Sequence, residues 1–171
     1  MYLLTALAFL FLSPTAQFSE TGPTYTYDPD VVPVGAAAVA VAMESGNVPV
    51  ELGRTRVGLA VDGLLPDRTY GAHVHTGECG ADPAAAGPHT QNRPDPVQPS
   101  VDPAYANPVN EVWLDFTTNA QGDAVAIARV PWSLSAREAR SVVLHAEGTH
   151  TEPGHAGTAG KRLACVPLES R

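Results

Sequence analysis

The chain has 171 residues, with 15 glycines, 16 prolines and only 16% charged residues. This length predicts a single domain large enough to enclose a core. Scarce charge and abundant Gly and Pro, without a long 3.6-residue period, favour an all-β domain with irregular loops. The formal net charge of −8 argues against nucleic acid as a partner and against a basic membrane-surface module, but leaves an anionic small substrate possible.

The N-terminal segment is almost wholly apolar over residues 1–12 and then becomes small and polar. This pattern predicts a secretory signal peptide over residues 1–16. The apolar run is too short to span a bilayer comfortably, so we expect no stable membrane insertion. The protein would then be secreted or otherwise extracytoplasmic. A buried N-terminal helix is the alternative.

Residues 17–33 are polar and proline-rich, which predicts a linker or extended arm ahead of a domain over 34–171. Within the domain, short segments alternate apolar and polar residues, as strands of a half-buried sheet do. They are 34–43, 54–62, 71–75, 111–118, 123–130, 141–147 and 163–168. Residues 119–122 predict a hairpin turn between two of these strands. Seven or eight short strands with long connections indicate a Greek-key β-barrel or sandwich.

Two long segments lack this alternation. Residues 77–110 contain seven prolines, and a loop of this length is either functional or disordered. Residues 148–160 form a second loop, rich in Gly, Thr and His. The chain's two cysteines are Cys79, near the start of the first loop, and Cys165. An even count in an exported chain favours one disulfide, and two buried free thiols are the alternative.

His73 and His75 lie one residue apart in a predicted strand. Side chains alternate along a strand, so these two share one face while Tyr70, Ala72 and Val74 take the other and form core. Two imidazoles on one face of a rigid strand are aimed at a common point, which suits a transition metal. The alternative is a strand with two half-exposed histidines and no ligand.

Other histidines can join this pair. His145 lies on the outward face of the predicted strand 141–147, and His89 lies in the first long loop. If the two strands are neighbours, three or four imidazoles converge on the outside of the sheet. Four imidazoles with no thiolate and little carboxylate favour copper over structural zinc. We expect His150 and His155 to be ordinary residues of the second loop.

Five motifs occur in a fixed order along the chain. They are Gly71-Ala72-His73-Val74-His75, Gly77-Glu78-Cys79, Ala86-Gly87-Pro88-His89, Val143-Leu144-His145-Ala146 and Gly157-Thr158-Ala159-Gly160-Lys161-Arg162-Leu163-Ala164-Cys165. In this order they resemble the copper-zinc superoxide dismutases, and the likeness covers roughly residues 34–168. The resemblance implies a Greek-key β-barrel with a bound copper ion.

The resemblance also assigns roles to individual residues. It implies that the copper ligands are His73, His75, His89 and His145. It implies a disulfide between Cys79 and Cys165. It further implies that Arg162 is the active-site arginine, which guides and holds the superoxide anion, and that His89 delivers a proton.

The chain departs from this family at the zinc site. In the copper-zinc enzymes the histidine that matches His89 bridges both metals, and further histidines in the same loop bind zinc. No histidine lies between His89 and Glu111 here, and Glu111 stands at the position of the zinc aspartate. The chain therefore resembles the copper-only members, so we expect no bound zinc and an acidic partner, Glu111, that orients His89. A solvated carboxylate at a strand start is the alternative.

These observations predict an exported, copper-dependent superoxide dismutase that converts superoxide into oxygen and hydrogen peroxide. The first alternative is a non-catalytic copper-binding protein on the same fold. The second is a structural sandwich in which the histidines are incidental. The complete set of four candidate ligands argues against the structural protein, and Arg162 favours the enzyme over the binding protein.

Overall fold

The computed structural model describes residues 16–45 and 54–170. Within these ranges it contains nine strands and one short 3₁₀ helix, and no α-helix. The strands are β1 (Ala16–Gln17), β2 (Tyr25–Thr26), β3 (Ala37–Glu44), β4 (Thr55–Asp62), β5 (Thr69–His75), β6 (Phe116–Thr117), β7 (Ala124–Val130), β8 (Ser141–His145) and β9 (Arg162–Ser170), and the 3₁₀ helix η2 is Pro83–Ala86. Among these residues no helix is long and apolar enough to cross a membrane. The predicted signal peptide, apart from Ala16, lies outside the described residues.

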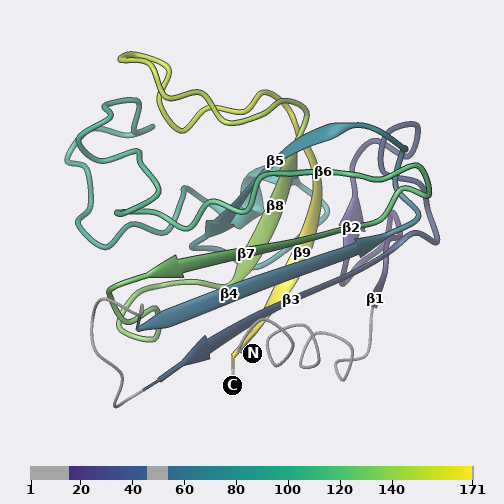
Figure 1. The fold of residues 1–171 in the computed structure, drawn as a ribbon, viewed down its shortest axis with the longest axis horizontal. Helices are drawn as coiled ribbons and strands as arrows, with labels where there is room; N and C mark the ends of the chain where they lie inside the picture. Colours follow the sequence, from purple (N-terminus) through teal and green to yellow (C-terminus); the bar gives the residue numbers. More distant parts are fainter. Residues whose placement is uncertain (1–15, 46–53, 171) are drawn as a thin grey trace.

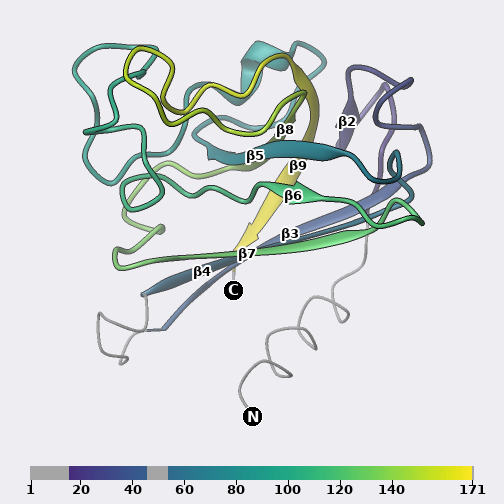
Figure 2. The same cartoon turned by 45° about the horizontal axis from the view of Figure 1, so that its top comes forward.

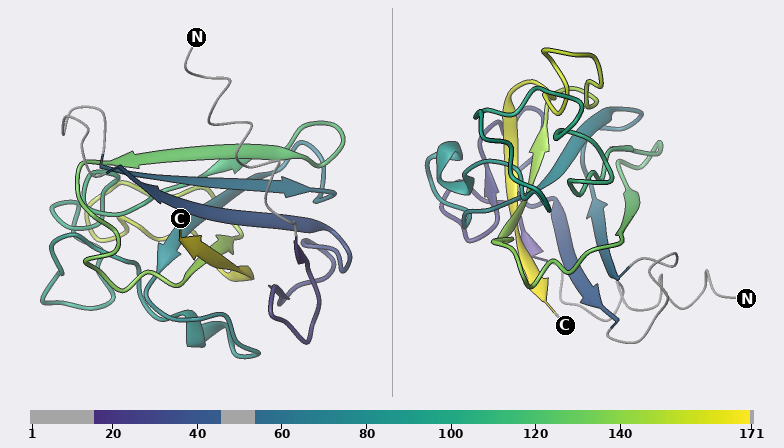
Figure 3. Two further views of the ribbon diagram at one scale, coloured as in Figure 1. Left: turned by 90° about the horizontal axis from the view of Figure 1, so that it is seen from below. Right: turned by 90° about the vertical axis from the view of Figure 1, so that its left-hand side faces the viewer.

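The strands form a nearly closed sheet in the order β6-β5-β8-β9-β3-β4-β7. All pairs along this path are antiparallel except β3 with β9, which is parallel. In Figures 1 and 3, β3, β4 and β7 make one layer and β5, β8 and β9 make the other. The connections from β4 to β5 and from β7 to β8 cross between the layers, as Greek-key connections do. The predicted all-β barrel or sandwich is thus confirmed.

The core lies between the layers and follows the alternation that the sequence predicts. Tyr70, Ala72 and Val74 of β5 are all fully buried there. The inward side chains of β4 and β8, Val57, Leu59, Val61, Val142 and Leu144, belong to the same cluster. Burying a large aliphatic or aromatic side chain stabilises the fold by roughly 1.5–3 kcal/mol before entropic costs.

The prediction of a hairpin on either side of residues 119–122 was wrong in one respect. The turn itself exists, closed by a hydrogen bond from the Asn119 amide to the carbonyl of Asp123. However, β6 pairs with β5, whereas β7 pairs along its whole length with β4. The turn therefore joins the two layers of the barrel. Each strand can bury its apolar face in the core without pairing with the other, so alternation alone does not require a hairpin.

Residues 17–33 form an extended arm that is built into the barrel. β1 pairs with β3, and β2 pairs with β9. Phe18 and Val32 are 1% and 0% exposed and belong to the main core. The core of the domain thus includes residues that precede position 34.

Two long connections cover the outer face of β5 and β8. They are residues 76–115, between β5 and β6, and residues 146–161, between β8 and β9, and Figure 2 shows them side by side. The amide of Gly154 donates to the carbonyl of Val101, which joins the two loops directly. The predicted disulfide between Cys79 and Cys165 is present and ties the first loop to β9.

Candidate metal centre

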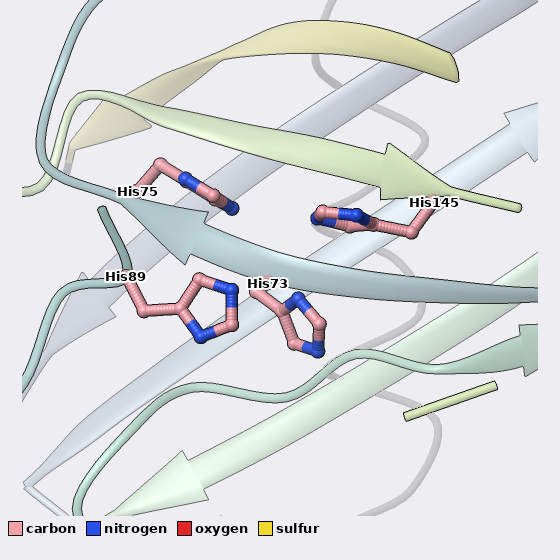
Figure 4. A group of neighbouring side chains, drawn as sticks. All are labelled: His73, His75, His89 and His145. Atoms are coloured by element: carbon pink, nitrogen blue, oxygen red, sulfur yellow. The ribbon is translucent and has the colours of Figure 1, made fainter. Parts of the chain in front are cut away.

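Four predicted ligands come together under the two loops. β5 lies beside β8, and Gly71 pairs with His145, so both outward histidines of β5 share a face with His145. The first loop returns along β5, where an isolated bridge pairs His75 with His89. One ring nitrogen from each of His73, His75, His89 and His145 lies within 4.8 Å of the others, and Figure 4 shows the rings converging.

Hydrogen bonds fix the orientation of three of these rings. The acceptors are the Gly87 carbonyl for His75, at 2.9 Å, the Gly160 carbonyl for His145, at 3.3 Å, and the Glu111 carboxylate for His89, at 2.8 Å. In each case the ring atom is Nδ1, and because these oxygens accept, Nδ1 carries the proton. The lone pair of a neutral ring is then on Nε2, which is the tautomer that a metal needs.

The ring of His73 is held through Nε2 instead of Nδ1. Its Nε2 lies 2.7 Å from Oγ1 of Thr149, in the second loop. Its Nδ1 is therefore the atom left for a ligand. Because His73 and His75 present opposite ring nitrogens, two residues on one strand can reach the same point from different directions.

The inner nitrogens have no partner within the described structure. Nδ1 of His73 and Nε2 of both His75 and His145 are buried and make no hydrogen bond. The three side chains belong to residues only 0–5% exposed. Leaving a buried polar atom unsatisfied costs about 1–3 kcal/mol, so three of them around one point fit an electron-pair acceptor such as a transition-metal ion.

Electrostatics keep these rings neutral, as metal ligation requires. Burial lowers the pKa of His73 and His75 well below 6.5, and the neighbouring His89 lowers both further. Burial likewise lowers the pKa of His145 to about 4. A neutral imidazole is the ligating form, so His73, His75 and His145 stay in that form into mildly acidic conditions.

Glu111 lies beside His89, where the sequence predicts it. It is 1% exposed and accepts three hydrogen bonds. Besides His89 Nδ1, the donors are Nε2 of Gln91 to Oε1 and Nε1 of Trp113 to Oε2, both at 2.7 Å. A buried carboxylate with this many donors is held in a single position and orients the His89 ring. Sequence reasoning missed Gln91 and Trp113.

Arg162 begins β9 next to the ligands. Its guanidinium donates to the carbonyls of Pro83 at 2.7 Å and Gly87 at 2.6 Å. The Gly87 carbonyl also accepts from His75, so one oxygen links the arginine to a ligand. Together with Lys161, Arg162 lines an open hollow of about 810 Å³. Burial lowers the pKa of Arg162, yet a guanidinium stays charged at neutral pH.

Comparisons with known proteins agree with the fold. A crystallised double mutant of a SOD-like protein from Bacillus subtilis has a TM-score of 0.51 and 18% sequence identity, over 73% of this chain and 84% of that chain. A single mutant of a SOD-like protein from the same organism gives 0.49 and 18%, over 78% and 88%. No protein-family model and no curated protein sequence matches the chain. The chain therefore shares the fold of a protein described as superoxide dismutase-like.

His150 and His155 lie apart from this cluster. Both are exposed, in the second loop. Nε2 of His150 lies 3.4 Å from Glu147, and its Nδ1 lies 3.6 Å from Glu152. Neither histidine joins the four-residue group that can hold a metal.

Proposed function

We propose that the protein is an exported, copper-dependent superoxide dismutase without bound zinc. The observation that carries this proposal is the convergence of three unpartnered, buried ring nitrogens with a fourth imidazole, next to a cation. His73 would bind through Nδ1, and His75, His89 and His145 would bind through Nε2. An all-imidazole site with no thiolate suits copper.

Copper bound there would supply a redox couple that accepts an electron from one superoxide and returns it to a second. Two superoxide ions and two protons then give one oxygen molecule and one hydrogen peroxide molecule. The residues of the chain must attract the anion, hold the ligands and supply protons.

Arg162 serves the first role. It keeps a positive charge close to three of the ligand rings, where its field lowers the pKa of His73, His75 and His145. The protein as a whole carries a net charge of −8, so an anion approaches only where local cations outweigh that field. Lys161 lines the same hollow, but its ammonium is paired with Asp28 at 2.9 Å, so Arg162 is the main local cation.

His89 and Glu111 serve the proton role. His89 has the most accessible side chain of the four ligands, at 18% exposure, and shares its Nδ1 proton with the Glu111 carboxylate. The other three rings are sealed from water. We assign the proton-delivering edge of the site to His89 for this reason. Glu111 would keep the Nδ1 proton and the ring orientation, and a proton for the product would be carried on Nε2 when that atom is not bound to metal.

The disulfide and the apolar N-terminal segment of the sequence support the proposed export. Disulfides persist in oxidising compartments and are rare in the reducing cytosol. The bond between Cys79 and Cys165 ties the loop that carries His89 to β9. The site would thus be complete only after oxidation of this pair.

A non-catalytic copper-binding protein is the second candidate. Two donors of Arg162 are already engaged by backbone carbonyls, which leaves fewer for an incoming anion. Three of the four ligands are almost completely buried, as in a site built to retain metal.

Purified protein loaded with copper, or with copper and zinc together, distinguishes these functions. We expect one copper per chain, no stoichiometric zinc, and dismutation that Arg162→Ala reduces at least tenfold at unchanged copper content. Arg162→Lys keeps the positive charge, so it should retain part of the dismutation rate. The rate of this variant should also depend on ionic strength as the wild-type rate does. Arg129→Ala removes an exposed arginine on β7 and serves as the control of equal charge. Bound copper without dismutation would leave only the binding protein, and stoichiometric zinc would refute the copper-only site.

A further inference from the structure

A threonine hydroxyl stands between a ligand and a carboxylate. Oγ1 of Thr149 lies 2.7 Å from Nε2 of His73 and also 2.7 Å from Oδ1 of Asp115. The direct separation between His73 Nε2 and Asp115 Oδ1 is 3.9 Å, too long for a hydrogen bond. The hydroxyl therefore bridges the His73 ring and the Asp115 carboxylate by hydrogen bonds.

The direction of both hydrogen bonds follows from counting protons. A threonine hydroxyl has one hydrogen, and a carboxylate can only accept, so Thr149 donates to Asp115. Its oxygen must then accept from His73, whose proton is placed on Nε2. The order is imidazole N–H to hydroxyl to carboxylate, and it leaves the lone pair of His73 on the inward-facing Nδ1.

Asp115 is fixed by three donors in total. Besides the hydroxyl, the amide of Thr149 donates to Oδ2 at 2.7 Å and the amide of Ala72 donates to Oδ1 at 3.1 Å. Ala72 is adjacent to His73 on β5. The carboxylate therefore binds the ligand strand and the second loop at the same time.

Gly71 provides the space that this contact needs. A Cβ there would lie 2.5 Å from the Glu147 carbonyl oxygen and 2.6 Å from Cβ of Ala159. Both contacts are closer than real side chains tolerate, and both are with the second loop. A side chain at position 71 would push this loop, and Thr149 with it, away from His73.

We infer that Thr149 and Asp115 are positioning residues for the metal centre: they select the tautomer and ring orientation of His73 through a hydroxyl relay. The other three ligands are oriented through Nδ1 by two backbone carbonyls and Glu111. His73 alone depends on a side chain of the second loop. Metal affinity is thereby linked to closure of that loop.

The relay also transmits charge. A carboxylate behind the hydroxyl makes the imidazole a stronger electron donor than a neutral acceptor would. We expect it to favour the oxidised, more highly charged state of a bound metal. This second consequence rests on the proposed copper chemistry, whereas the tautomer of His73 does not.

Four variants test the relay. Thr149→Val removes the hydroxyl at nearly constant shape, and Thr149→Ser restores it. Asp115→Asn removes the charge but keeps an acceptor. Thr158→Val makes the same change as Thr149→Val elsewhere in the second loop, where the Thr158 hydroxyl donates only to the carbonyl of His155.

The first measurement is made on metal-free protein, with nitrogen chemical shifts of the imidazoles recorded by NMR at pH 8. Wild type, Thr149→Ser and Thr158→Val should show the Nε2-protonated form of His73, whereas Thr149→Val should show a mixture of tautomers. An unchanged His73 spectrum in folded Thr149→Val would overturn the inference. So would wild-type protein with the proton on Nδ1.

The second measurement is the Cu(II) affinity, from competition with a chelator. Thr149→Val should weaken Cu(II) binding by about 10- to 100-fold. The affinity of Asp115→Asn should lie between those of Thr149→Val and wild type, and Thr149→Ser should bind within about threefold of wild type. Equal affinity of Thr149→Val and wild type would overturn the link to metal binding. If wild type binds copper but does not dismutate superoxide, the proposed function fails while both measurements of the relay stand.

Discussion

Both faces of β5 are buried, but they differ in whether their polar atoms have hydrogen-bond partners. On the inward face, Tyr70 and Val74 are fully buried, and the one polar atom there, the Tyr70 hydroxyl, donates to a backbone carbonyl. On the outward face, His73 and His75 are equally buried, yet each keeps a ring nitrogen without a partner. Burial alone therefore does not distinguish a core from a site.

The difference lies in what covers each face. The inward face is closed by the opposite layer of the barrel, where apolar side chains interlock. The outward face is closed by the loops 76–115 and 146–161, which bring polar groups to one nitrogen of each ring and leave the other bare. The inward face stabilises the fold, whereas the outward face leaves unsatisfied nitrogen atoms that can hold a metal ion. The variants below separate these roles.

The disulfide should have the largest effect, because it holds the cover of the outward face. Cys79 and Cys165 are separated by 86 residues. A loop of this size is worth at most about 4–5 kcal/mol of unfolding free energy in the chain-entropy model. The double variant Cys79→Ser/Cys165→Ser should unfold at lower urea and also bind metal more weakly. Reduced wild type should behave in the same way, and an unchanged urea midpoint would contradict the prediction.

Two neighbours on β8 offer a matched test of the faces. Leu144 points into the core and is 0% exposed, whereas His145 points to the site. Leu144→Ala should lower the unfolding free energy by about 2–5 kcal/mol and leave metal stoichiometry intact.

His145→Ala should do the reverse. It removes a ligand and one unsatisfied nitrogen, so tight metal binding is lost while the metal-free protein loses less stability than Leu144→Ala does. Chemical denaturation and metal titration of both variants check the pair. Equal destabilisation with retained metal in both would show that the outward face is ordinary core.

The outward face should also make the metal-free protein sensitive to acid. The pKa of His145 is about 4 in the folded protein, below the value of about 6.5 expected for an unfolded chain. Between these values the unfolded chain binds more protons, so stability falls as the pH drops from about 6.5 to 4. The loss is about 3 kcal/mol for His145 alone.

His73 and His75 extend this loss to lower pH, because their pKa values lie still further below 6.5. Urea unfolding of metal-free protein at several pH values measures the slope. Leu144→Ala should show the same pH slope from a lower starting stability, and His145→Ala a shallower one. A stability that stays constant from pH 7 to 4.5 would contradict the prediction.

Local sequence patterns predict most of the strands and the faces that they bury. Alternation along 54–62 and 141–147 marks the inward side chains correctly, because one buried face fixes a strand's register. The pairing of β7 with β4 instead of β6 could not be predicted, since alternation says which face a strand buries but not which strand lies beside it.

Part of the site was predictable from strand alternation and part only from the family resemblance. Alternation indicates His73 and His75 and makes His145 and His89 candidates, whereas the family motifs assign all four as ligands and add Arg162 and Glu111. Thr149 and Asp115 could not be predicted from the sequence. Their roles depend on tertiary hydrogen bonds that join the two long loops to β5. Gln91 and Trp113 escaped for the same reason, since only the folded loop brings them to Glu111.

The smallest expected effect concerns the edge of the outward face, at His89. Glu111→Gln keeps the shape of the side chain but replaces a charged acceptor by an amide, so His89 is oriented less firmly. We expect Cu(II) affinity to fall about tenfold, equivalent to about 1.4 kcal/mol, with little change in core stability. Glu147→Gln, at an exposed carboxylate near His150, is the control of equal charge. If both variants bind copper like wild type, Glu111 is a structural carboxylate held by Gln91 and Trp113, and the ring of His89 is fixed by its place in the loop alone.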